Sequence, residues 1–190
     1  MALVIYSGGR AAFQVYEQGR DLNLKWRRGL VMGSFGVANN TAASTALSTD
    51  GAQTCQIIVV HKAPGQGALG HYQATSNPNE IAQGVHDMIQ ALGGLPVANV
   101  VLAAGEIDHL PAQGESGGQR TQLDYQIEVI AQVRTVCPGA DVVWPPAPQG
   151  DLWGACYYLP LEELVGLRPN SIGDYLNGGN NVGGISVRDY

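Results

Sequence analysis

The sequence predicts a single α/β domain, an α+β sandwich whose central mixed or antiparallel sheet is flanked by helices. Short apolar runs of strand length alternate with two amphipathic runs of helix length, and this alternation is typical of sheets covered by helices. The 190 residues include 26 glycines and only 14% charged residues, which favours tight turns and short strands over long charged helices. This length suits one domain, residues 1–190, with its own hydrophobic core.

The first third of the chain carries the weakest patterns. Apolar stretches at 2–6, 12–16 and 22–26 predict three short strands. Residues 29–46 are rich in Gly, Ser, Ala, Asn and Thr and have no clean periodicity, so we expect an irregular loop or a short helix there. Residues 1–46 are accordingly expected to form either an N-terminal arm or extra strands packed on the core.

The clearest pattern is a predicted β-hairpin that begins at Cys55. The β-branched run at 57–60 predicts a strand that is buried on both faces. A Pro-Gly-Gln-Gly turn at 64–67 allows the chain to reverse, and the return strand at 68–74 contains His71. We therefore expect a thiol and an imidazole on neighbouring strands.

Helices and further strands follow the hairpin. Polar capping residues, an early proline and an acidic first turn at 76–80 predict the start of a helix, and Gly93-Gly94 predicts its end. The remaining expected elements are a strand at 97–104, a loop at 106–120, a helix at 123–136, a strand at 141–144, a short helix at 161–167 and a loop with an edge strand in the Gly/Asn-rich tail.

Composition argues against several classes of partner and site. A net charge of −6, with no basic run longer than 25–28, argues against nucleic acid or an anionic membrane as a partner. The N-terminus lacks a signal-peptide pattern, and no apolar run reaches the roughly 18 residues of a membrane span. Three cysteines without CxxC spacing predict neither a disulfide framework nor a structural zinc site. We expect a cytoplasmic protein, or an effector exported without a cleaved signal peptide, with no metal or cofactor.

Cys55 and His71 are the candidate catalytic pair. Sixteen residues separate them, which suffices for a strand, a tight turn and a return strand, so they can be cross-strand neighbours. A cysteine nucleophile needs such a neighbour because the thiolate is the reactive form, and imidazole accepts the thiol proton near neutral pH. Backbone N–H groups near Thr54 are candidate oxyanion donors, and Gly70 would let a substrate come close to His71.

Two other interpretations of this pair stay open. Free cysteine is among the most buried residue types, so Cys55 can be a small hydrophobic residue in a non-catalytic binding or structural domain. His71 would then be a hydrogen-bonded strand histidine. Alternatively, the same pair can serve a cysteine protease or a transglutaminase.

The hairpin resembles the core of the bacterial cysteine-dependent glutamine deamidases. These include the chemotaxis receptor deamidase (CheD) and the catalytic domains of cytotoxic necrotizing factor and Burkholderia lethal factor. In this family a cysteine opens an apolar strand and a histidine lies on the next strand. The segment Gly67-Ala68-Leu69-Gly70-His71 is similar to the family's Gly-Gly-Leu-Ala-His, and Thr49 precedes Cys55 by six residues, where some members have a threonine. Ala52-Gln53-Thr54 stands where the family has Leu-Gly-Ser or Leu-Ser-Gly.

The resemblance implies a deamidase-like core within residues 47–146 and a thiol amidohydrolase activity. Cys55 would be the nucleophile, His71 its base and Thr49 the residue that orients the imidazole. Thr54 and Gly70 would then contact the oxyanion or the substrate. The implied partner is a protein that carries a glutamine, either a receptor inside a bacterium or a host protein modified by a virulence effector.

Two further sets of residues compete with this pair. His61 lies six residues after Cys55, and six strand residues span about 20 Å, so His61 is the weaker candidate base. Glu106, Asp108 and His109 follow a predicted strand end, where active-site loops are common. They form an alternative acid–base or metal-binding cluster.

Overall fold

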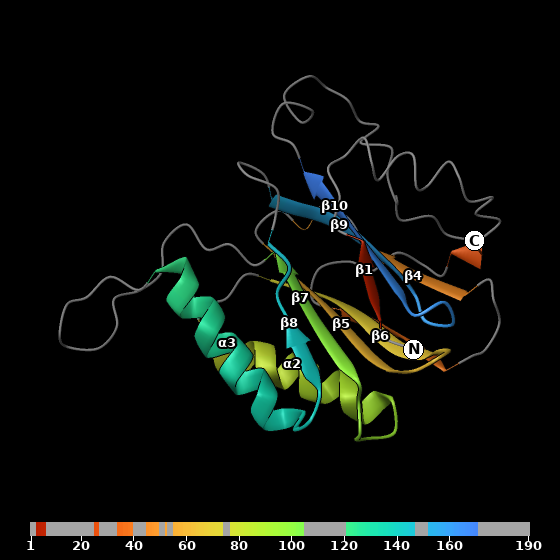
Figure 1. Ribbon diagram of the computed structural model, residues 1–190, viewed down its shortest axis with the longest axis horizontal. Coiled ribbons are helices and arrows are strands. Elements are labelled where there is room, and N and C mark those ends of the chain that lie inside the picture. Colours follow the sequence, from red (N-terminus) through yellow and green to blue (C-terminus); the bar gives the residue numbers. More distant parts are fainter. Residues whose placement is uncertain are drawn as a thin grey trace.

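The computed structural model describes residues 3–6, 25–26, 34–39, 45–49, 52, 55–73, 77–104, 121–146 and 152–170. Within these residues the chain forms two sheets and two helices (Figure 1), so the predicted α+β class is confirmed. The strands are β1 (Val4–Tyr6), β2 (Lys25–Trp26), β3 (Ser34–Asn39), β4 (Thr45–Thr49), β5 (Gln56–Ala63), β6 (Gln66–Tyr72), β7 (Asn99–Ala104), β8 (Asp141–Val143), β9 (Leu152–Leu159) and β10 (Leu164–Asn170). The helices are α2 (Pro78–Ala91) and α3 (Gln122–Val136).

The predicted hairpin forms two inner strands of one of the two sheets. Its strands β5 and β6 belong to a sheet of order β3-β6-β5-β7-β8, called the central sheet from here on. All neighbours in this sheet are antiparallel except β7 and β8, which are parallel. The central sheet is therefore mixed, as the sequence predicts. In the register, Val59 lies opposite Leu69 on β6 and Val101 on β7.

A second sheet has the order β1-β10-β9-β4-β2 and is called the outer sheet. Its main unit is the antiparallel β9–β10 hairpin, and β4 pairs with β9 so that Thr49 lies opposite Cys156. β1 and β2 are parallel to their partners β10 and β4. Strands from before residue 47 thus take part in both sheets, with β3 in the central sheet and β1 and β2 in the outer sheet.

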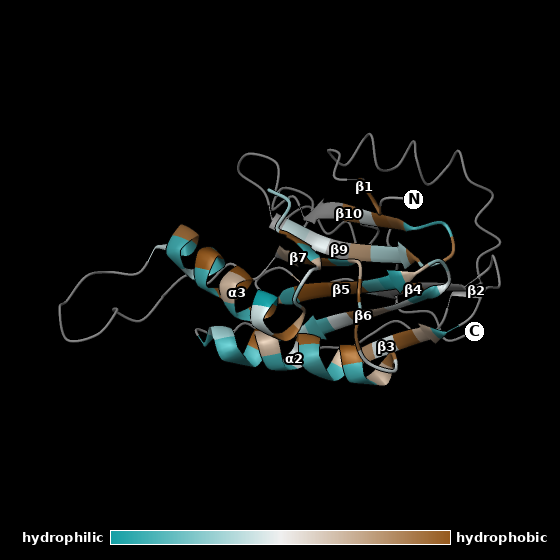
Figure 2. Ribbon diagram, turned by 60° about the horizontal axis from the view of Figure 1, so that its bottom comes forward, coloured by the Kyte–Doolittle hydropathy of each residue, from teal (hydrophilic) through white to brown (hydrophobic). Residues whose placement is uncertain are grey.

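The molecule has three layers. α2 and α3 cover one face of the central sheet, and the outer sheet packs on the opposite face (Figures 1 and 2). The sequence predicts the covering helices but not the second sheet. Two hydrophobic cores result, one on each face of the central sheet. Among the described helices, none is long and apolar enough to cross a bilayer.

Successive residues of β5 alternate between these two cores. Ile58 and Val60 pack against the helices, whereas Ile57 and Val59 pack against the outer sheet. All four side chains are 0% exposed, because adjacent strand residues point to opposite faces and both faces are covered. The strand buried on both faces that the β-branched run predicts is confirmed.

Both helices begin and end with the expected local chemistry. The Asn77 side chain caps α2, and Thr121 and Asp124 form a reciprocal capping box at the start of α3. The chain leaves α2 through Gly93 and Gly94, whose φ values of 82° and 85° lie in the left-handed region that glycine adopts easily. The boundaries predicted for the two helices are therefore close to those observed.

The prediction of a loop or short helix at 29–46 is wrong for the residues of this range that the structure describes. These residues, 34–39 and 45–46, lie in the strands β3 and β4. The alternation that identifies β3 is short. Phe35 and Val37 face the helix side, and Ala38, which follows Val37, packs in the core between the sheets. Small residues hide this alternation in the sequence, and pairing with β6 supplies the order that local propensity lacks.

The prediction of a short helix at 161–167 is also wrong. A turn follows Pro160, and Glu163 adopts φ 53° immediately before β10 begins. Val165 and Leu167 are then both buried between the two sheets, as residues two apart on a strand should be. Three further predictions lie outside the described residues: the strand at 12–16, the loop at 106–120 and the elements of the tail. Of the strand predicted at 22–26, the structure describes the part that forms β2.

Candidate functional site

The hairpin register places Cys55 and His71 on one face of the central sheet. His71 lies opposite Ile57, and Cys55 precedes Ile57 by two residues. Cys55 itself directly precedes β5, which begins at Gln56, and an extended backbone there would put it on the side of Ile57. Cys55 also packs against the core between the two sheets. Both predicted residues therefore face the outer sheet, at the end of the hairpin far from its turn.

Thr49 reaches His71 from the other sheet. Its Oγ1 lies 2.7 Å from His71 Nδ1, and the two side chains are 1% and 4% exposed. Thr49 is the last residue of β4, so this hydrogen bond joins the outer sheet to the central sheet. If Nδ1–H donates to the threonine oxygen, the lone pair of the imidazole is on Nε2.

Cys55 occupies the boundary between the buried core and the surface. Its side chain is partly exposed, whereas Gln56, the next residue, is 1% exposed. Gln56 Nε2 donates to the carbonyl oxygens of Ala103 and Ile57 at 2.9 and 3.2 Å. These bonds tie the beginning of β5 to the end of β7, so the backbone that carries Cys55 is anchored directly after the thiol.

Backbone contacts also hold the chain just before Cys55. The Ala52 amide donates to the Gly154 carbonyl of β9 at 2.9 Å, and this bond connects the segment between β4 and β5 to the outer sheet. The Ala52 amide is thereby engaged within the protein. Thr54, the predicted oxyanion residue, lies outside the described residues.

Gly70 of β6 does not have the role that the sequence suggests. A Cβ at Gly70 would lie 2.5 Å from the Tyr72 ring and 3.2 Å from Met88 Sδ, so Gly70 faces α2 and not the side that His71 occupies. A Cβ at Gly67 would lie 1.9 Å from the Tyr158 hydroxyl oxygen. Space over both glycines is filled by aromatic side chains, so the expectation that Gly70 opens room for a substrate is corrected.

His61 belongs to a different cluster at the turn end of the hairpin. Its Nδ1 lies 2.6 Å from the Tyr158 hydroxyl and its Nε2 lies 3.3 Å from Glu163 Oε1. The His61 side chain is 1% exposed. Because both ring nitrogens have partners within this cluster, His61 is not a base for Cys55.

Sequence reasoning missed Tyr158 and Glu163 because their role depends on pairing across the two sheets. Tyr158 lies in an aromatic stretch of β9, and Glu163 in a turn that was predicted as helix. One signal was available in the sequence: a small residue, Gly67, where the hairpin returns opposite His61. A glycine directly across from a buried histidine leaves a gap that another side chain must fill.

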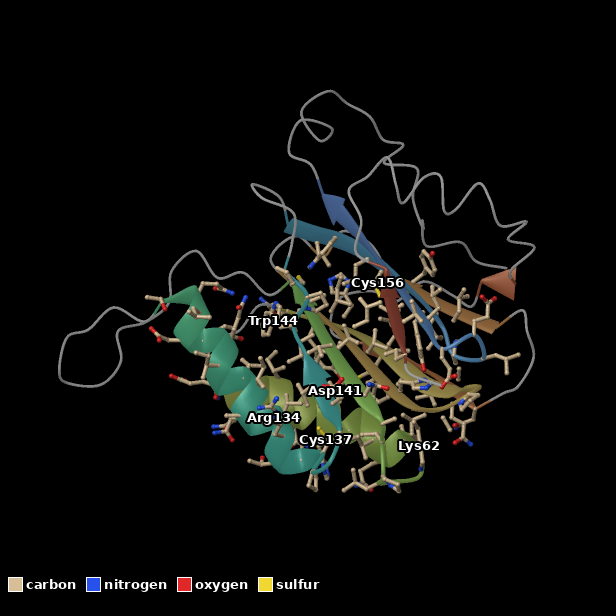
Figure 3. The ribbon with its side chains drawn as sticks, viewed as in Figure 1. Lys62, Arg134, Cys137, Asp141, Trp144 and Cys156 are labelled. Atoms are coloured by element: carbon tan, nitrogen blue, oxygen red, sulfur yellow. The ribbon has the colours of Figure 1, made fainter. Side chains whose placement is uncertain are left out.

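The other two cysteines are buried structural residues. Cys137 ends α3 and its Sγ donates to the Val133 carbonyl at 3.0 Å, and burial raises its pKa to about 11. Cys156 is 0% exposed between the sheets, and burial raises its pKa strongly. Figure 3 shows them far apart, on opposite sides of the central sheet. Neither is a reactive thiol, since burial disfavours the thiolate.

Metal binding has no support in the part of the chain that the structure describes. No group of three His, Cys, Asp or Glu side chains there could hold a metal ion. The alternative cluster of Glu106, Asp108 and His109 lies outside the described residues.

Comparison with known proteins adds no assignment. No protein-family model matches the chain, and no curated protein matches it either.

Proposed function

We propose that the protein is a thiol amidohydrolase that deamidates a protein glutamine to glutamate, with Cys55, His71 and Thr49 as its site. The observation that supports this most is the Thr49–His71 hydrogen bond of 2.7 Å. It supplies the third group that a Cys–His pair needs to fix the imidazole orientation. The partial exposure of Cys55, directly before β5, also supports it, since a substrate must reach the sulfur.

The first half of the reaction forms a thioester. His71 Nε2 accepts the Cys55 thiol proton while Nδ1–H stays bonded to Thr49. The thiolate sulfur attacks the carboxamide carbon of the substrate glutamine, and a C–S bond forms as the C–O π electrons move to oxygen. When the carbonyl reforms, the C–N bond breaks and the imidazolium gives its proton to the departing nitrogen, so ammonia leaves.

The second half releases glutamate. His71 takes a proton from a water molecule, whose oxygen attacks the thioester carbon. The C–S bond then breaks and the thiol proton returns to Cys55. The same thioester transferred to an amine would give transglutamination, and attack on a peptide carbonyl would give proteolysis. Ammonia release with a gain of glutamate separates deamidation from both.

Substitution of Cys55 by alanine is the direct test of this function. Purified wild type and Cys55→Ala would each be incubated with a library of folded proteins and glutamine-containing peptides. Ammonia and the glutamine-to-glutamate mass gain would be measured. We expect both signals with wild type and neither with Cys55→Ala, because Cys55 is the one partly exposed thiol among the described residues.

Cys137→Ala serves as a matched control in the same experiment. It removes one buried thiol on the helix side of the central sheet and should leave ammonia release intact. Unchanged release in Cys55→Ala would refute the nucleophile assignment. Peptide cleavage without ammonia would favour the protease interpretation instead.

A further inference from the structure

Two buried histidine contacts connect the central sheet to the outer sheet. One joins His71 of β6 to Thr49 of β4, and the other joins His61 of β5 to Tyr158 of β9, at 2.7 and 2.6 Å. The two histidines lie on partner strands of one hairpin. Their two partners lie on strands that also pair with each other, because Tyr158 is opposite Leu47 and Thr49 is two residues further along β4.

The Tyr158 side chain occupies the space that the missing side chain of Gly67 leaves on β6. Gly67 is the cross-strand partner of His61, and a Cβ there would lie 1.9 Å from the Tyr158 hydroxyl oxygen and 2.5 Å from two of its ring carbons. The phenol therefore lies over the glycine backbone, and its hydroxyl reaches the imidazole beside it. The two rings meet edge to face, with an interplanar angle of 88°.

The hydrogen atoms in this cluster can be placed from its chemistry. The Glu163 carboxylate can only accept, so His61 Nε2 carries a hydrogen and donates to it. The neutral ring then accepts through Nδ1 from the Tyr158 hydroxyl. Burial raises the pKa of Tyr158, which keeps the phenol protonated and able to donate. In this neutral form of His61, both ring nitrogens are hydrogen-bonded.

We propose that Tyr158, His61 and Glu163 form a clamp between the two sheets, which holds Thr49 within hydrogen-bonding distance of His71. Its effect on catalysis rests on the function proposed above. Both histidine contacts connect the β5–β6 strand pair to the β4–β9 strand pair. A shift of one strand pair against the other therefore lengthens both hydrogen bonds. The members of the clamp are positioning residues, because His61 is 1% exposed and Glu163 is 7% exposed.

Protonation of His61 would place a positive charge on a buried ring. Burial lowers the pKa of His61 below its ordinary value of 6.5, although the hydrogen bond and the charge of Glu163 act in the opposite direction. Among the described residues, Tyr158 of β9 and Glu163 before β10 are the titratable groups against the ring. The amine of neighbouring Lys62 is turned to the helix side, where it donates to the Leu92 and Gly94 carbonyls.

The sign of the resulting pH dependence follows from this lowered pKa. Below about pH 6.5 the unfolded chain binds a proton at this histidine and the folded protein does not. The contribution of His61 to stability is therefore complete above that pH and is lost as the pH falls towards the folded-state pKa. The unfolding equilibrium constant should rise by up to about tenfold per pH unit across that window from this group.

Tyr158→Phe tests the clamp, because it removes one oxygen and keeps the ring in its slot. Tyr157→Phe is the matched control. It removes the same oxygen from the preceding residue of β9, whose ring packs over Gly166. Three quantities would be measured for the full chain: the unfolding constant between about pH 7.5 and pH 5.5, the ring ¹⁵N NMR signals of His71, and the kcat and KM of ammonia release.

In Tyr158→Phe we expect a larger unfolding constant than in wild type across this pH range, because the folded state loses the hydrogen bond to His61. The ring ¹⁵N signals of His71 should change from those of the Nδ1–H tautomer to those of a mixture of tautomers. The kcat of ammonia release should fall severalfold with KM unchanged. Gly67→Ala should move the His71 signals in the same way. Tyr157→Phe should match wild type in all three quantities.

The clamp is refuted if Tyr158→Phe keeps the wild-type unfolding constant and the wild-type His71 signals. If the wild-type protein releases no ammonia from any substrate, the proposed function fails. The unfolding and NMR measurements then still decide the clamp, because neither depends on a substrate.

Discussion

Replacing His71 with alanine is expected to lower the rate of ammonia release by about 100- to 10,000-fold, the usual contribution of a general base. His61 does not replace the imidazole, because both of its ring nitrogens are held by Tyr158 and Glu163. The loss should appear in kcat, since His71 acts on the reacting atoms. Ammonia release under single-turnover conditions would measure it.

Two control substitutions accompany this variant. His86→Ala removes a partly exposed histidine on α2 and should leave the rate unchanged. Thr49→Ser keeps a hydroxyl opposite His71 and should retain most of the activity, whereas Thr49→Val should lose a large part of it. An unaltered rate in His71→Ala would remove His71 from the mechanism.

Alanine at Ile57 and alanine at Ile58 are each expected to lower the free energy of unfolding by about 2–5 kcal/mol, the usual cost of such a deletion in a packed core. Both side chains are 0% exposed, but Ile57 packs against the outer sheet and Ile58 against the helices. Urea unfolding of each variant would give the two values. Because the sites lie on opposite faces, each substitution opens a cavity in a different core.

An exposed residue of the same hairpin supplies the control for this pair. Gln66→Ala, at the start of β6, should change the free energy of unfolding by less than about 0.5 kcal/mol. A small loss at Ile57 beside a large loss at Ile58 would contradict the three-layer arrangement. It would instead fit a sheet that is covered by helices on one face and by solvent on the other.

The hairpin and both helices could be predicted because their signals are local. The β-branched run of β5, the turn at Pro64 and Gly65, and the caps of α2 each depend on a few adjacent residues. The turn is slightly tighter than expected, since β6 already begins at Gln66. Gly65 adopts φ 80°, as a turn glycine can without strain.

The outer sheet could not be predicted because its pairings are distant in the sequence. β4 pairs with β9 more than a hundred residues later, and β1 pairs with β10. The short strands β3 and β4 are rich in small residues, which have weak strand preferences on their own. These segments become strands because they pair with β6 and β9. Their secondary structure therefore depends on tertiary contacts and not on local composition.

The candidate site divides in the same way. The shared face of Cys55 and His71 follows from counting residues along a hairpin. The contact between Thr49 and His71 crosses from one sheet to the other, and only the family resemblance pointed to it. For the cluster of His61, Tyr158 and Glu163, the sequence offered only Gly67 opposite His61.

The reactivity of Cys55 tests the central claim most directly, and it requires no substrate. Wild type and His71→Ala would be treated with iodoacetamide near neutral pH, and the modified peptide would be quantified by mass spectrometry over time. If Cys55 and His71 form one nucleophilic site, alkylation of Cys55 will be severalfold faster in wild type than in the folded variant. Equal rates in the two proteins would contradict the account and leave Cys55 as a structural thiol.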